Sequence, residues 1–179
     1  MHEPQATFER SLNHITETKP LFLEDMKVGD RWSSPWREIT GEDVADFARL
    51  TGDHDSLHSS TSSASPFGEP VAHGLLGLSV LAGLGSDHPN ASTLALVGIS
   101  DWQFEAPIFF GDRVQVVTEV MQIQQHGRRA GRVTWLRQLV NQHGRIVQRG
   151  NFVTLVATRS RARHLTNQEH TQRGTLPPR

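Results

Sequence analysis

The second half of the chain consists of four β-prone segments separated by short turns, and this pattern restricts the fold more than any other feature. The turns fall at residues 107–112, 126–131 and 142–144. Short connections between long strands favour antiparallel hairpins, so we expect one meander-like antiparallel sheet. The segments are rich in valine, isoleucine, threonine and aromatic residues, and they span Leu94–Phe104, Arg113–Gln125, Arg132–Asn141 and Arg145–Thr158.

Two helices are expected before this sheet. Thr40 is a suitable N-cap for Gly41–Leu50, because Asp43 completes a capping-box-like pair three residues later. The segment Gly74–Leu84 is almost entirely apolar and small, which predicts a core helix buried on every side. Its three glycines each lower helix propensity by roughly 1 kcal/mol relative to alanine, so we expect the sheet to approach it closely. Together these elements predict an α+β fold with the sheet packed against the apolar helix.

The chain length of 179 residues suits one domain with additional length at both ends. We place an N-terminal extension at residues 1–20, the domain at residues 21–158 and a basic C-terminal tail at residues 159–179, which we expect to be flexible. The start of the chain lacks the apolar run of a secretory signal, and no stretch is apolar enough to cross a bilayer. We therefore expect a cytoplasmic protein that does not associate with membranes.

The composition excludes several kinds of chemistry. The sequence contains no cysteine, so disulfides, thiolate metal sites and cysteine nucleophiles are ruled out. The formal net charge is −1, from 18 basic and 19 acidic residues, and such a balance offers no general attraction to nucleic acid. A small-molecule or protein partner is the better expectation.

Two short stretches carry the residues for a reaction, namely residues 52–58 (Gly-Asp-His-Asp-Ser-Leu-His) and residues 70–74 (Pro-Val-Ala-His-Gly). A turn between Asp53 and His58 could bring both to the mouth of one pocket, where a carboxylate and an imidazole that share a water form a workable acid/base pair. The unpaired N–H groups around Gly74, at the start of the apolar helix, could hold a thioester oxygen that gains negative charge.

Each of these residues also has a structural interpretation when taken alone. Asp53 fits the turn after a helix, His58 fits a surface loop, and residues 72–74 fit an ordinary helix entry; their occurrence in this order favours a site. We interpret His54 and His73 as structural rather than catalytic. A metal site built from His54, Asp55 and His58 is a weaker alternative, because their spacing matches no common ligand pattern.

These residues resemble the MaoC-like, or (R)-specific enoyl-CoA hydratase, family of hot-dog proteins. The family signature is a Gly-Asp-x-Asn-Pro-x-His loop, followed by a short apolar-His-Gly segment that opens the central helix. Gly52, Asp53, Leu57 and His58 match the first part, and Pro70, Ala72, His73 and Gly74 match the second. The similarity continues through residues 22–30 and 104–112 and covers roughly residues 21–158.

The resemblance implies a single hot-dog domain, in which an antiparallel sheet wraps a long central helix, and a homodimer with its pocket at the subunit interface. It assigns catalysis to Asp53 and His58, which would activate water, and to the Gly74 N–H, which would polarise the thioester carbonyl. Asp55, Ser56 and His73 would contact the substrate. The implied reaction adds water to a 2-enoyl thioester or removes it from a 3-hydroxyacyl thioester, carried on coenzyme A or an acyl carrier protein, with no metal or redox cofactor.

The loop departs from the family signature at two positions, because Asp55 and Ser56 stand where the family has Asn and Pro. The loop thereby loses the rigidity of proline and gains a second carboxylate. This change leaves two alternatives to hydration open. One is a different reaction on an acyl thioester, either hydrolysis or conjugate addition of another nucleophile such as an amine. The other is a non-catalytic acyl-binding subunit.

Overall fold

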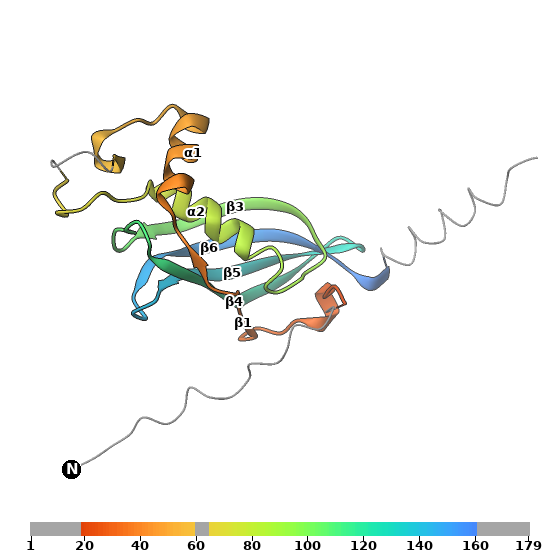
Figure 1. The fold of residues 1–179 in the computed structure, drawn as a ribbon. Coiled ribbons are helices and arrows are strands. Elements are labelled where there is room, and N and C mark those ends of the chain that lie inside the picture. Colours follow the sequence, from red (N-terminus) through yellow and green to blue (C-terminus); the bar gives the residue numbers. More distant parts are fainter. Residues whose placement is uncertain (1–18, 60–64, 161–179) are drawn as a thin grey trace, which may run out of the picture.

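The computed structural model describes residues 19–59 and 65–160, which form one antiparallel sheet with a helix lying across one face (Figure 1). Most of the extension and tail expected at the two ends lies outside the described residues, and the boundaries at residues 20/21 and 158/159 stay a prediction. In chain order the elements are η1 (Leu23–Asp25), β1 (Arg31–Ser33), β2 (Arg37–Glu38), α1 (Gly41–Thr51), η2 (Ser56–His58), α2 (Gly74–Leu84), β3 (Thr93–Phe104), β4 (Arg113–His126), β5 (Ala130–Asn141) and β6 (Ile146–Ala157).

The four long strands lie where the sequence predicts them, within two residues at each end, but their pairing differs from a simple meander. The sheet order is β1-β4-β5-β6-β3, with β2 also paired to β4. Strands β4, β5 and β6 do form successive hairpins. The expected hairpin between β3 and β4 is wrong, because β3 pairs with β6 at the opposite edge.

Two features explain why β3 and β4 do not pair. The free edge of β4 is already occupied by β1 and β2. Hydrogen bonds also tie the connection from β3 to β4 to other segments. The N–H groups of Glu105 and Ala106 both donate to the Val147 carbonyl of β6, and the Ile108 carbonyl accepts from the Ala72 N–H just before α2. The connection therefore passes beside the start of α2 instead of closing a tight turn.

Helix α2 packs on the sheet through one face only. Leu76, Gly77, Val80 and Leu81 are buried, whereas Leu75 and Ser79 on the other side are exposed. The expectation of a helix buried on every side is therefore wrong for the single chain, because one layer of sheet covers only one side of a helix. The buried side meets Val116, Val120, Trp135 and Phe152 in the main hydrophobic core.

Close approach of the sheet accounts for two of the three glycines of α2. A Cβ atom on Gly77 would lie 2.3 Å from Gln148 Nε2 and 2.7 Å from Ile108 Cδ1. A Cβ on Gly74 would lie 2.9 Å from the ring of Phe104. A Cβ on Gly83 would meet no atom within 4 Å, so the same explanation is wrong for Gly83.

Helix α1 begins and ends with the signals expected from the sequence. The Thr40 side chain accepts from the Asp43 N–H at 3.1 Å, and Asp43 accepts from the Thr40 N–H at 2.9 Å, which confirms the capping box. Gly52 ends the helix in the left-handed region at φ 79°, a conformation that favours glycine. This end matters for function because Asp53 follows directly.

One charged side chain lies in the core beneath the end of α2. Arg137 of β5 is 8% exposed, donates from Nη2 to the Gly85 carbonyl at 2.9 Å and lies 4.7 Å over the ring of Phe152. Burial lowers the pKa of the Arg137 guanidinium below its usual range, to about 10.

Within the described part of the chain, no helix is long and apolar enough to span a membrane.

Candidate active site

The loop at residues 53–58 is fastened to the start of α2 by three hydrogen bonds. The Val71 N–H donates to the Leu57 carbonyl at 3.1 Å, and its own carbonyl accepts from His58 Nδ1 at 2.7 Å. From the other side, His73 Nε2 donates to the Asp53 carbonyl at 3.0 Å. Two stretches that are separate in the sequence therefore form one rigid unit.

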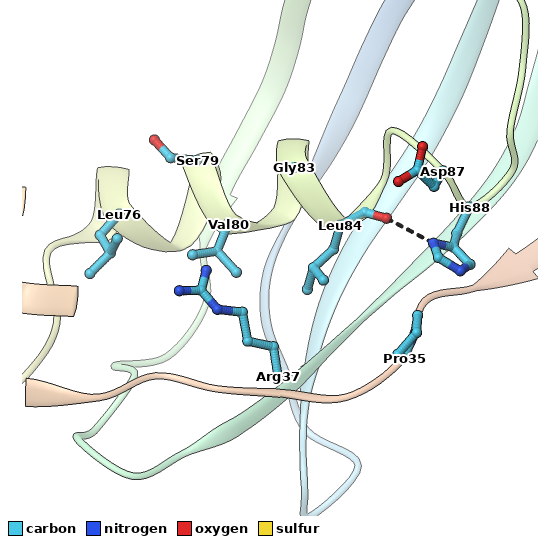
Figure 2. Close-up of a pocket in the computed structure, with 9 residues that line it drawn as sticks. All are labelled: Pro35, Arg37, Leu76, Ser79, Val80, Gly83, Leu84, Asp87 and His88. Carbon is cyan, nitrogen blue, oxygen red and sulfur yellow. Dashed lines mark hydrogen bonds between the residues drawn. The ribbon is translucent and has the colours of Figure 1, made fainter. Parts of the chain in front are cut away.

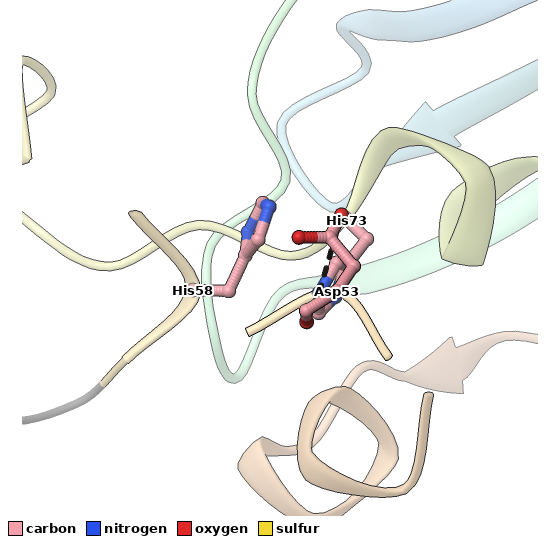
Figure 3. A group of neighbouring side chains, drawn as sticks. All are labelled: Asp53, His58 and His73. Atoms are coloured by element: carbon pink, nitrogen blue, oxygen red, sulfur yellow. Dashed lines mark hydrogen bonds and ion pairs between the residues drawn. The ribbon is translucent and has the colours of Figure 1, made fainter. Parts of the chain in front are cut away.

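Asp53, His58 and His73 meet at this junction (Figure 3). One polar side-chain atom from each lies within 4.8 Å of the other two. The Asp53 carboxylate is half exposed, His58 is partly buried and His73 is buried. The structure thus brings Asp53 and His58 together, as the spacing suggested, and adds His73 to the group.

The hydrogen bond to Val71 determines which nitrogen of His58 is available. A carbonyl oxygen only accepts, so the His58 Nδ1 must carry the proton in this bond. In a neutral ring the other nitrogen, Nε2, is then unprotonated and can accept a proton. This arrangement holds the imidazole of His58 in the form required of a general base.

His73 supports the other two residues. Its ring stacks on His58, with centroids 3.7 Å apart and planes inclined by 29°, and its centroid lies 5.1 Å from that of the Phe47 ring. Its Nε2 is used in the bond to the Asp53 backbone, and its Nδ1 is buried without a partner among the described residues. These contacts agree with a structural interpretation of His73, whereas its expected contact with substrate stays a prediction.

The neighbouring loop residues hold the turn together. Asp55 accepts from the Leu57 N–H at 2.9 Å and so caps η2, which begins at Ser56. The Asp55 N–H in turn donates to the Asp53 carboxylate at 3.3 Å. The hydrogen bond from the Leu57 N–H to the Asp55 carboxylate therefore stabilises the turn, although the loop lacks the proline of the family signature. Whether Asp55 and Ser56 also contact substrate stays a prediction.

The side chains that could bind a metal ion differ from those considered in the sequence analysis. Among the described residues, the group with converging ligand atoms is Asp53, His58 and His73, so the alternative that combined His54 and Asp55 with His58 is wrong. Two of the four ring nitrogens in this group are already hydrogen-bonded, His58 Nδ1 to the Val71 carbonyl and His73 Nε2 to the Asp53 carbonyl. His58 Nε2 therefore stays available for proton transfer.

Gly74 lies next to this cluster as the first residue of α2. Its N-cap, His73, makes no side-chain capping hydrogen bond, so the N–H groups of the first helical turn are not capped by that side chain. Phe104 packs against the Cα of Gly74, where any larger residue would collide with the ring. Sequence reasoning missed this role of Phe104, because only the fold brings β3 to the start of α2.

A groove of about 450 Å³ runs along α2 from the turn after Gly74 (Figure 2). Leu76, Val80 and Leu84 supply an apolar wall, and Arg37 faces them from β2. Asp87 and His88 lie at its far end, where His88 Nδ1 is bonded to the Leu84 carbonyl at 3.2 Å. The α2 residues that line the groove begin at Leu76, two positions after Gly74.

The antiparallel sheet and the helix across its face define a class of protein, the hot-dog proteins. A hot-dog structure from Mycobacterium tuberculosis, described as having a double hotdog fold, matches the chain with a TM-score of 0.65 at 16% identity, covering 78% of this chain and 44% of that one. At this level of identity the match concerns the fold alone.

Sequence comparison gives the family. Residues 26–140 match the model of the MaoC like domain. A relative from Methylorubrum extorquens named 3-hydroxybutyryl-CoA dehydratase is 34% identical over 119 residues, which cover 65% of this chain and 74% of the relative. The structure of the MaoC-like dehydratase from Rhodospirillum rubrum matches with a TM-score of 0.71 and 28% identity, covering 78% of this chain and 98% of that one. The chain belongs to the MaoC-like dehydratase family.

Proposed function

We propose that this protein is a hydro-lyase that adds water to a 2-enoyl thioester and, in reverse, removes it from a 3-hydroxyacyl thioester. The observation that carries the proposal is the His58 imidazole, which lies in one group with Asp53 and His73 and whose Nδ1 is used by the Val71 carbonyl, so that Nε2 is the nitrogen left to accept a proton. Membership of the MaoC-like dehydratase family supports the same reaction.

In the proposed mechanism, one water molecule is held between the Asp53 carboxylate and His58 Nε2. One O–H bond of the water breaks as the Asp53/His58 pair takes its proton, and the water oxygen bonds to the β-carbon while the C=C π bond breaks toward the thioester. The pair then delivers a proton to the α-carbon. The negative charge that develops on the thioester oxygen is stabilised by the Gly74 N–H, at the positive end of the helix dipole. The reaction requires only these groups and water, so we expect turnover to survive dialysis against a metal chelator.

The proposal also assigns places to the parts of the substrate. The apolar groove along α2 suits the acyl chain, since it begins beside Leu76 in the turn that follows Gly74. The proposed carrier of the thioester is coenzyme A or an acyl carrier protein, and turnover of one form of the same acyl group over the other distinguishes them. We further propose that the protein acts in the cytoplasm.

We propose a homodimer because the single chain leaves apolar surface open on an edge strand. Strand β3 is paired on one side, to β6, and five of its large apolar side chains are exposed. An exposed apolar edge strand favours pairing with another chain. The exposed residues are Leu94, Leu96, Val97, Ile99 and Phe104.

The direct test is to incubate the protein with short and medium 2-enoyl-CoA thioesters, to follow the loss of the conjugated-thioester absorbance and to identify products by mass. We expect hydration, and a loss of about 100-fold or more in kcat for Asp53→Asn and for His58→Gln, since each removes a partner in general acid/base catalysis. His54→Gln is the matched control, because His54 is exposed and outside the cluster.

Three outcomes would contradict the proposal. Full activity in Asp53→Asn would remove the assigned pair, and release of free thiol without hydration would indicate a thioesterase. No turnover with coenzyme A or carrier-protein substrates would favour a non-catalytic subunit.

A further inference from the structure

A glutamine from the sheet makes a buried contact with the first residue of α2. Gln148 of β6 is 1% exposed, and its Nε2 donates to the Gly74 carbonyl at 3.0 Å. Its Oε1 is also buried and has no hydrogen-bond partner among the described residues. The side chain therefore makes one hydrogen bond at the cost of a buried, unsatisfied acceptor.

Stability alone does not explain this residue. A buried amide oxygen without a partner is unfavourable, whereas a methionine of similar length would fill the same space without an unsatisfied group. The helix also makes room for the contact, because a Cβ on Gly77 would lie 2.3 Å from Gln148 Nε2. Both features favour a role for the hydrogen bond itself.

The contact acts on a peptide group at the start of α2, next to the candidate site. The Gly74 carbonyl and the Leu75 N–H belong to one peptide unit, and a donor on the carbonyl polarises that N–H. The same bond restrains the backbone of Gly74 and hence the direction of the Gly74 N–H. His73 provides no side-chain cap for these first-turn donors, so the hydrogen bond from Gln148 is a restraint that the sheet adds.

We propose that Gln148 is a positioning residue for the hydration reaction: by holding the Gly74 carbonyl, it aims and strengthens the first-turn N–H donors of α2 at the thioester oxygen. The proposal rests on the proposed function. Gln148 touches neither the water nor the substrate, so it acts on the rate through Gly74.

The chain offers a matched control at the other end of the helix. Arg137 is buried in the same face of the sheet and donates to the Gly85 carbonyl at 2.9 Å, just beyond the end of α2. Arg137→Met removes a buried hydrogen bond to α2 without touching its first turn. A purely structural role for such bonds would make Gln148→Met and Arg137→Met behave alike.

The first experiment compares kcat and KM for the wild type, Gln148→Met and Arg137→Met with the enoyl-CoA substrate that the wild type hydrates best. We expect kcat to fall about tenfold in Gln148→Met with little change in KM, less than the loss of a direct oxyanion donor causes. Arg137→Met should keep the wild-type kcat. An unchanged kcat in Gln148→Met, or an equal loss in both variants, would overturn the proposal.

A second variant supplies a pH readout. In Gln148→Glu, burial should raise the pKa of the introduced carboxyl above its usual range. At low pH the protonated carboxyl can donate to the Gly74 carbonyl, and at higher pH the carboxylate would repel it. We therefore expect the activity of Gln148→Glu relative to wild type to fall as pH rises between about 5 and 8, while that of Gln148→Met stays low throughout. A flat ratio for Gln148→Glu would contradict the assigned hydrogen bond.

A measurement on the folded protein separates this proposal from the proposed function. The ¹⁵N shift of the Leu75 amide reports on the hydrogen bond to the Gly74 carbonyl, because both groups belong to one peptide unit. We expect this shift to change in Gln148→Met and to stay constant in Arg137→Met. A wild type without turnover refutes the proposed function, whereas an active wild type with an unchanged Leu75 shift in Gln148→Met refutes the role of Gln148.

Discussion

Replacing two glycines of α2 by alanine should change stability in opposite directions. At Gly83 a new Cβ meets no atom within 4 Å, so Gly83→Ala should gain the helix propensity of alanine, about 0.5–1 kcal/mol. At Gly77 the new Cβ would lie 2.3 Å from Gln148 Nε2 and 2.7 Å from Ile108 Cδ1. Contacts this short require the neighbours to move.

The expected size of the Gly77 effect follows from three contributions. Overpacking a core position costs about 1–3 kcal/mol, and alanine returns about 1 kcal/mol of helix propensity. Displacing Gln148 also removes its hydrogen bond to the Gly74 carbonyl, worth about 0.5–1.5 kcal/mol. We therefore expect Gly77→Ala to lower the free energy of unfolding by about 0.5–3.5 kcal/mol.

Urea denaturation, followed by tryptophan fluorescence, measures both effects at one protein concentration. The midpoint should rise for Gly83→Ala and fall for Gly77→Ala, with similar slopes. A stabilising Gly77→Ala would show that the sheet does not approach α2 as closely as the structure indicates. A strongly destabilising Gly83→Ala would show that another surface covers that side of the helix.

Three further predictions test other parts of the structure. Thr154→Val should lower the free energy of unfolding by about 1–3 kcal/mol in urea denaturation, because it leaves the buried Trp135 Nε1 without its 2.8 Å acceptor; an unchanged midpoint would refute the value of this bond. Val97→Lys, on the exposed edge strand β3, should convert the proposed dimer into a species of 20.0 kDa in size-exclusion chromatography; an unaltered elution volume would place the interface elsewhere. The pKa of Arg137 is lowered to about 10 in the folded chain, so the unfolded chain binds more protons than the folded one above that pH, and the unfavourable burial of the charged guanidinium is relieved as pH rises above 10. The stability of the wild type relative to Arg137→Met should therefore be constant below pH 9 and increase by up to about 1.4 kcal/mol per pH unit above pH 10, and a constant difference across pH 8–11 would contradict it.

The family resemblance guided the choice of site residues, but the structure explains how the loop is held. Asp53 and His58 could be selected from the sequence because they fall in one short loop rich in turn residues. Which ring nitrogen of His58 carries the proton could not be predicted from the sequence, because it depends on a hydrogen bond to the Val71 carbonyl, 13 positions away. Sequence reasoning placed His54 and Asp55 in a metal alternative, and the observed group contains His73 instead.

Local interactions account for what the sequence by itself determined: the capping box that begins α1, the bounds of α2, the four long strands and the Asp53–His58 loop. These features depend on residues within a few positions of one another, whose hydrogen bonds and alternation do not require the rest of the chain. The tertiary structure decided that β3 pairs with β6, that one face of α2 stays open, and that Gln148 reaches Gly74 across 74 positions of sequence. Such contacts depend on which strand edges remain free and on which face of each element packs inward, and competition among distant segments settles both.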